Sequence, residues 1–303
     1  MGRLAVAGVA TLCGALGACP YLAPLGGTPG SLILVYLSQL PLFIGGLWGG
    51  ATAAALAGIT ASLMLLAASN VMAVIMFAAL NVVPVILLVR QALLARTGAD
   101  GAVEWYPPGL LTAWLTGLGL VAAAVTFVFF GGPQGTQTAL REALVPSLDR
   151  HLGEITPELD ELLSFIAFIL PGIVATSWMV MTTTNGSLAQ GLLARFGASW
   201  RPSPDLAALG LPMWIPVLLA FAAGATLFGG TARFIGVNVL IVLAVPFCLA
   251  GLAVLHTVAR RFPRPAVTLV TFYLLAGFLG WPLLLIAVLG LLDSPLGLRR
   301  RFA

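Results

Sequence analysis

The chain almost lacks charge where it is apolar, and this absence excludes more functions than any motif adds. Roughly nine apolar stretches run between Leu4 and Leu292, and none of them contains an Asp or a Glu. Charged residues make up 8% of the chain, hydrophobic residues make up 60%, and all of the 14 basic residues are arginines. A carboxylate within the membrane, on which many ion-coupled pumps depend, is therefore excluded as the coupling or metal-binding group.

The chain also lacks the motifs of common enzyme classes. It contains no HExxH, Walker A or GxSxG sequence. The cysteines Cys13, Cys19 and Cys248 lie in or beside apolar stretches at no metal-ligand spacing. His151 has no second ligand nearby, and the lone His256 suits a membrane interface better than a proton relay. We therefore expect no catalytic residue, no cofactor and no metal site.

Composition predicts an all-α polytopic bundle with about 8–10 membrane segments, since each span needs roughly 20 apolar residues. We expect one membrane domain over residues 1–303, in a bacterial cytoplasmic (inner) membrane. The expected helices are 4–19, 31–47, 50–69, 71–89, 109–131, 162–184, 209–230, 234–258 and 265–292.

Arginines cluster beside the ends of these stretches, so the net charge of +4 indicates membrane topology and not nucleic-acid binding. With a cytoplasmic amino terminus, the loops 90–108, 185–208 and 259–264 fall inside, and the acidic loop 132–161 falls outside. The tail Arg299–Arg301 then conflicts with this rule, unless the segment 265–292 breaks at Gly280-Trp281-Pro282. We expect either one long bent span or two short helices there, because proline interrupts a helix.

The external loop 131–161 predicts an amphipathic helix, because leucines recur every four residues from Leu140. Thr156 and Pro157 are typical of a helix start, as N-cap and first helical residue. Such a helix either covers a binding site as a lid or lies along the membrane surface as a connector, which we favour. The loop repeat comprises Leu140, Leu144, Leu148 and Leu152 and continues through Ile155, Leu159 and Leu163, with Arg141, Glu142, Asp149, Arg150 and Glu154 on other faces.

Four spans combine a proline with a polar or amphipathic side chain near mid-depth. Prolines free carbonyl groups, and polar side chains in hydrocarbon then bond to these groups, to one another or to a ligand. Transporters build solute sites in this way, although hydrogen bonds between helices are the simpler interpretation. The candidate solute-binding residues are Gln39, Asn81, Trp178 and Asn238.

Small residues form stripes at helical spacing in two spans. They are Ala10, Gly14 and Ala18 in the first, and Gly50, Ala54, Gly58 and Ser62 in another. Such stripes let helix backbones approach closely, either within the chain, which we favour, or against a partner subunit. Cys19 also follows an apolar run as in bacterial lipoprotein signals, but an uncleaved span with an incidental cysteine is the simpler expectation.

The C-terminal half carries a series of short motifs. They are Phe165-Ile166-Ala167-Phe168-Ile169-Leu170-Pro171, Leu192-Leu193-Ala194-Arg195-Phe196-Gly197, Leu211-Pro212, Val237-Asn238-Val239-Leu240, Leu289-Gly290-Leu291-Leu292-Asp293 and Leu298-Arg299-Arg300-Arg301. In their order, these motifs resemble the YybS-like family of uncharacterised bacterial membrane proteins. That family is remotely similar to the S-components of energy-coupling-factor transporters, which bind vitamins or metal ions. The resemblance implies a transmembrane coupling protein with ATPase subunits as partner, docked on Ala10, Gly14 and Ala18.

These observations predict a non-enzymatic, S-component-like subunit that binds a small, uncharged or weakly charged solute within the lipid bilayer. The alternative is a structural or scaffold protein of a bacterial envelope complex with no path for a solute. A polar cavity beneath residues 138–160 would favour transport. Amides that bond only to one another, with no polar cavity, would favour the scaffold.

Overall fold

The computed structural model describes residues 2–23, 31–99, 101–152 and 156–299, without the side chains of residues 32, 144–152, 207 and 295. The predicted residues Glu154, Ile155, Arg300 and Arg301 lie outside this description, as do the side chains of Leu144, Leu148, Asp149, Arg150, His151 and Leu152. The elements in chain order are α1 (Arg3–Leu22), α2 (Ser31–Val35), α3 (Gln39–Gly49), α4 (Ala51–Ala68), α5 (Val71–Phe77), the π-helix η2 (Ala78–Val82), α6 (Val83–Ala92), β1 (Ala95–Thr97), β2 (Val103–Trp105), α7 (Pro108–Phe130), α8 (Gly132–Leu152), α9 (Pro157–Arg195), the 3-10 helix η3 (Leu206–Ala208), α10 (Trp214–Ala225), α11 (Gly230–Ala259), α12 (Pro265–Leu279) and α13 (Pro282–Leu296).

The chain is an all-α, multi-pass membrane protein, as its composition predicts. Within the described residues, six helices are long and apolar enough to cross a membrane, and the bent pair α12–α13 makes up to seven. The apolar helices Ile33–Gly49 and Trp214–Ala225 are shorter. Many large hydrophobic side chains are exposed, Phe278 and Leu227 among them, at 89% and 86%. Lipid is the environment that covers such a surface.

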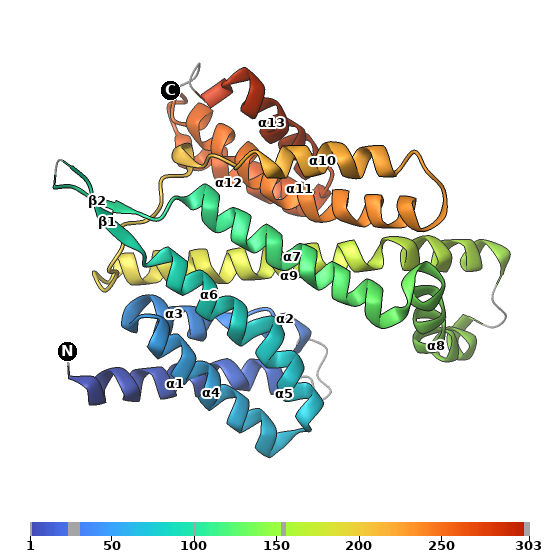
Figure 1. Cartoon of the computed structure of the whole chain (residues 1–303), viewed down its shortest axis with the longest axis horizontal. Helices are drawn as coiled ribbons and strands as arrows, with labels where there is room; N and C mark the ends of the chain where they lie inside the picture. The colour runs from blue at the N-terminus through green and yellow to red at the C-terminus, as the bar shows by residue number, and fades with distance from the viewer. Residues whose placement is uncertain (1, 24–30, 100, 153–155, 300–303) are drawn as a thin grey trace. The chain divides into compact units, whose positions relative to one another are not determined.

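The helices form two compact units (Figure 1), of which unit 1 comprises residues 1–111 and 180–205. In unit 1, α1 packs against α4 and α3, and α3 packs against α4 and α6. The core contains Phe77, Leu42 and Leu65, all almost fully buried. Close packing of these helices depends on small residues: a Cβ atom on Gly14 would lie 2.3 Å from the carbonyl oxygen of Ala57.

Unit 2 comprises residues 112–179 and 206–303, and α11 is its central helix. This helix packs against α13, α10 and α12. α11 and α13 cross at close range, because a Cβ atom on Gly251 or on Gly290 would lie 1.9 Å from a carbonyl oxygen of the other helix. Glycine is the residue that allows two helix backbones to approach so closely.

Two expected spans of unit 1 are interrupted. The span expected at 31–47 divides into α2 and α3 around a turn at residues 36–38. The span expected at 71–89 changes from α-helix to the π-helix η2 around Asn81. The reason in the second case is Pro84, which has no N–H to donate to the carbonyl group of Leu80 four residues earlier.

α9 is longer than the expected span 162–184, and it contributes to both units. Its start confirms the expected N-cap, since the N–H of Leu159 donates to Thr156 Oγ1 over 3.4 Å. Its end lies at Gly197, whose φ is +65°. There the N–H of Ala198 donates to Leu193 and that of Gly197 donates to Ala194, which is the hydrogen-bond pattern of a Schellman C-cap. The cytoplasmic loop expected at 185–208 is therefore mostly helix at its start.

The segment 265–292 is broken at the expected place. α12 ends at Gly280, whose φ is +70°. α13 begins at Pro282, and the two helices are bent by 118°. The loop 90–108 also holds an element that the sequence did not predict, an antiparallel hairpin in which Arg96 is opposite Glu104.

Candidate functional site

Unit 1 brings two of the predicted solute-binding residues together at its interrupted helices. Gln39 begins α3, and its Nε2 donates to the carbonyl oxygen of Leu80 over 3.1 Å. This is the carbonyl that Pro84 leaves without its usual helical donor. The neighbouring Ser38 donates from Oγ to Asn81 Oδ1 over 3.4 Å. Three buried polar side chains therefore join the start of α3 to η2.

Asn185 of α9 bonds to the turn that precedes Gln39, although the sequence placed it in a loop. Its Nδ2 donates to the carbonyl oxygens of Tyr36 at 2.6 Å and of Met181 at 2.8 Å. Asn185 is 1% exposed and Gln39 is 0% exposed. The sequence signal was misleading here, because the polar run from Thr182 contains Asn185-Gly186, a dipeptide typical of turns, yet the helix continues through it. We refer to Ser38, Gln39, Asn81 and Asn185 as the amide cluster.

Asn238 lies in unit 2 and bonds to backbone groups of α9 on both sides of Pro171, a proline inside this continuous helix. Its Oδ1 accepts from the N–H of Gly172 at 2.6 Å, and its Nδ2 donates to the carbonyl oxygens of Phe168 at 2.9 Å and Phe234 at 2.8 Å. Gly172 and Phe168 are a pair that normally bond to each other in an α-helix. One asparagine amide therefore takes both of these backbone groups, which is a structural role.

Trp178, the fourth predicted residue, also belongs to unit 2 and is half-buried in α9. It follows Thr176, whose Oγ1 donates to the carbonyl oxygen of Ile241 over 3.0 Å. The structure thus groups Gln39 with Asn81 in one unit, and it places Asn238 and Trp178 in the other.

A polar groove lies in unit 2 where the start of α8 meets α9 and α11. Its volume is about 850 Å³, which is within the range of pockets for small molecules. Phe165, Phe168 and Ile169 form an apolar wall on α9. The polar lining residues are Gln134, Glu161, Ser164, Thr231 and Arg233.

A hydrogen bond and an ion pair join α8 to α9 beside this groove. Gln137 Nε2 donates to Ser164 Oγ over 2.6 Å. One turn further along α8, Arg141 forms an ion pair with Asp160. In contrast, no described residue pairs with the carboxylate of Glu161 or the guanidinium group of Arg233. The groove therefore presents one acid, one base and an aromatic wall to a solute.

The predicted docking stripe packs inside unit 1. Ala10 is 1% exposed and Ala18 is 0% exposed, and Gly14 lies against Ala57 and Thr60 of α4. This arrangement is the intramolecular packing that we favoured from the sequence. A partner subunit would have to contact other residues.

Arg201 is a buried residue of the segment 185–208, which the sequence predicted to be a cytoplasmic loop. Its Nη1 donates to the carbonyl oxygen of Ala92 and its Nη2 to that of Tyr106, both at 2.9 Å. Its own carbonyl oxygen accepts from Gln190 Nε2 at 2.8 Å. Burial lowers the pKa of Arg201, but an arginine stays protonated. Arg201 thereby holds both ends of the hairpin segment against the end of α9.

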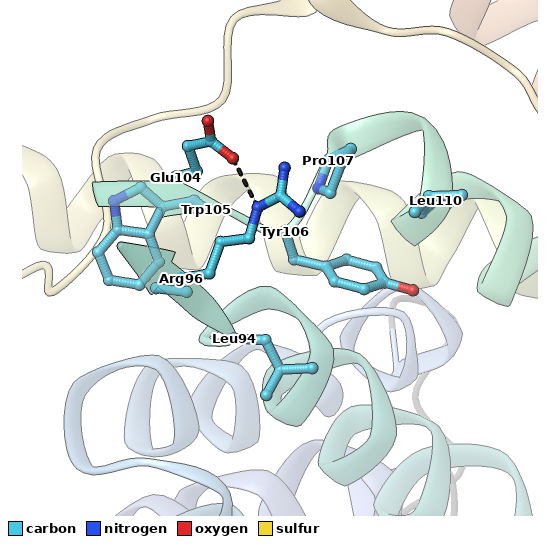
Figure 2. A pocket seen from close by; sticks show the side chains of 8 residues that line it. Leu94, Arg96, Glu104, Trp105, Tyr106, Pro107 and Leu110 are labelled. Carbon is cyan, nitrogen blue, oxygen red and sulfur yellow. Dashed lines mark hydrogen bonds and ion pairs between the residues drawn. The ribbon is translucent and has the colours of Figure 1, made fainter. Parts of the chain in front are cut away.

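The hairpin that Arg201 holds carries a small open pocket of about 380 Å³ (Figure 2). Arg96 on β1 pairs with Glu104 on β2 over 2.6 Å, and Trp105 and Tyr106 follow. The ion pair is largely exposed to solvent, so it contributes little to stability. Tryptophan and tyrosine are the residues preferred at a membrane interface, and this pocket offers no buried polar group for a specific ligand.

Comparison of the chain with family models, with curated proteins and with solved structures finds no match. Functional inference therefore rests on the geometry of this chain. Within the described residues, no group of three or more His, Cys, Asp or Glu side chains is placed to hold a metal ion. The polar features available for recognition are the amide cluster in unit 1 and the groove in unit 2.

Proposed function

We propose that the chain is the membrane-embedded, substrate-binding subunit of a bacterial transporter for a small solute. The observation that carries this proposal is the groove beside the start of α8, which adds two charged groups with no partner among the described residues to an apolar wall in an otherwise lipid-adapted chain. A solute with an apolar body and polar or weakly charged ends fits such a lining. Energy would come from a partner ATPase or from an existing gradient, because the apolar stretches carry no carboxylate.

The groove can be tested by removing its two unpaired charges together. The variant Glu161→Gln/Arg233→Gln keeps the shape of the groove, because both substitutions preserve most of the side-chain volume. We expect it to abolish the thermal stabilisation that a vitamin, nucleobase or other small solute gives to the purified wild-type protein. The matched control is Glu142→Gln/Arg195→Gln, which removes one exposed acid and one exposed base outside the groove.

Two results would contradict the proposal. One is equal solute binding by the groove variant, the control variant and the wild type. The other is a wild-type protein that no compound of the panel stabilises and with which no ATPase co-purifies from bacterial membranes, as identified by mass spectrometry.

A scaffold protein of an envelope complex is the second candidate. It is favoured by Asn238, whose hydrogen-bonding groups bond to backbone atoms of unit 2 and leave no amide for a solute. Under this alternative, the proteins that co-purify would be envelope-assembly proteins, and the groove variant would behave as the wild type does.

A further inference from the structure

The amide cluster of unit 1 contains two buried oxygen atoms that no described residue bonds. They are Gln39 Oε1 and Asn185 Oδ1. Each belongs to a side chain that is at most 1% exposed. An unsatisfied buried acceptor costs about 1–3 kcal/mol in a folded protein, so two such atoms in one cluster indicate a ligand.

The amide orientations are fixed by the hydrogen bonds of the nitrogen atoms. Gln39 Nε2 faces the carbonyl oxygen of Leu80, and Asn185 Nδ2 faces two carbonyl oxygens. Rotating either amide by 180° would bring oxygen against oxygen, which is repulsive. The oxygen atoms are therefore the groups left over, and they accept but cannot donate.

Both amides are linked to the short segment of residues 36–39, which carries the Gln39 side chain and accepts a hydrogen bond from Asn185. Asn185 bonds to Tyr36 from α9, Gln39 is three residues further along the chain, and η2 approaches the same segment through Leu80 and Asn81. The remaining side-chain oxygens of the cluster, Ser38 Oγ and Asn81 Oδ1, share only a long contact of 3.4 Å. The cluster thus gathers uncharged oxygens at interrupted helices.

We propose that the amide cluster binds one monovalent alkali cation, with Gln39 Oε1 and Asn185 Oδ1 as ligands. Hard cations take amide, hydroxyl and carbonyl oxygens, and uncharged oxygens at unwound helices bind Na⁺ in membrane transporters. A divalent cation normally needs carboxylates, which this cluster lacks. The amide cluster would thus bind a cation within apolar stretches that contain no acidic residue.

This cation site is independent of the proposed solute groove, which lies in unit 2. Cation binding does not depend on the proposed transport function. Only the use of an ion gradient to drive solute movement would rest on that function. The test therefore measures the cation alone, without any solute.

The experiment is equilibrium binding of radioactive Na⁺ to the full chain in detergent, with choline chloride keeping the ionic strength constant. We expect saturable binding by the wild type, and competition by unlabelled Na⁺ or K⁺ identifies the preferred ion. Gln39→Leu and Asn185→Leu are each expected to weaken binding by roughly tenfold or more, as loss of a metal-site partner does. Ser38→Ala removes one hydroxyl group only and serves as a milder variant if a leucine variant fails to fold.

The matched control is Asn238→Leu, which removes a buried amide of unit 2 and is expected to keep full Na⁺ binding. Three results would overturn the assignment. The first is no saturable Na⁺ or K⁺ binding by the folded wild type, which would leave water as the ligand. The second is unchanged binding by Gln39→Leu, Asn185→Leu and Ser38→Ala. The third is a loss of binding in Asn238→Leu that equals the loss in the unit 1 variants.

Discussion

The two units of this chain use buried amides in different ways. In unit 2, Asn238 accepts one hydrogen bond and donates two, all with backbone groups, two of which flank Pro171 in α9. In unit 1, Gln39 and Asn185 donate to backbone carbonyl groups but keep an oxygen that no described residue bonds. A polar residue in an apolar helix is therefore not a functional signal by itself. What distinguishes a binding group from a packing group is the hydrogen-bonding capacity that the fold leaves unused.

The largest expected effect is a loss of stability in unit 2, caused by a substitution at the crossing of α11 and α13. Gly290→Leu would place side-chain atoms where the Phe247 carbonyl group lies, and we expect it to lower the free energy of unfolding by about 3 kcal/mol. Reversible unfolding in mixed micelles measures this. Gly277→Leu is the control, because Gly277 has open space around it. If both variants lose the same stability, the close crossing is not a determinant of unit 2.

The next effect tests the structural role of Asn238. Asn238→Leu removes three hydrogen bonds, each worth about 0.6 kcal/mol within a membrane, so we expect a loss of about 2 kcal/mol in the free energy of unfolding. Thr176→Val removes the single bond to Ile241 and should lose about a third as much. Equal losses in the two variants would mean that the bonds of Asn238 beside Pro171 do not stabilise α9.

Arg201 of unit 1 resembles Asn238 in that its side chain bonds to two backbone carbonyl groups. Arg201→Met keeps much of the buried volume but removes these bonds, and we expect a loss of about 1.5 kcal/mol in the free energy of unfolding. Trypsin should then cleave after Arg96 faster than in the wild type, as measured by mass spectrometry of the fragments. An unchanged cleavage rate would show that Arg201 does not hold the hairpin.

The smallest expected change in stability belongs to Gln39. In sodium- and potassium-free buffer, Gln39→Leu loses one hydrogen bond to Leu80 but also removes a buried oxygen without a partner, and these effects oppose each other. We expect the free energy of unfolding in mixed micelles to change by less than about 1 kcal/mol. A loss as large as that of Asn238→Leu would show that both amides serve packing alone.

The sequence predicts the helices well, because a long apolar stretch has few stable alternatives in lipid. It also predicts the helix start at Thr156 and the break at Gly280, since both depend on local residues. It misses the π-helix at Asn81 and the depth to which α9 continues, because these depend on contacts with other helices. Pro84 predicts that the carbonyl group of Leu80 loses its usual helical donor, but only the fold shows that Gln39 bonds to this carbonyl group.

The candidate residues were predictable as a set but not as individuals. Gln39, Asn81 and Asn238 share the same pattern of an amide ahead of a proline, yet their hydrogen bonds differ. Asn185 and Arg201 lay in an expected loop, where a polar residue carries no signal. The groove in unit 2 joins residues of the consecutive helices α8 and α9 with residues of α11, which is far from them in the sequence, so no local motif predicts it.

The most direct measurement of the difference between the units is unfolding of three proteins in sodium chloride and in choline chloride at equal ionic strength. The proteins are the wild type, Gln39→Leu and Asn238→Leu. We predict that sodium stabilises the wild type and Asn238→Leu by the same amount and does not stabilise Gln39→Leu. Equal sodium stabilisation of all three proteins, or of none, would contradict the assignment of a binding role to the amides of unit 1.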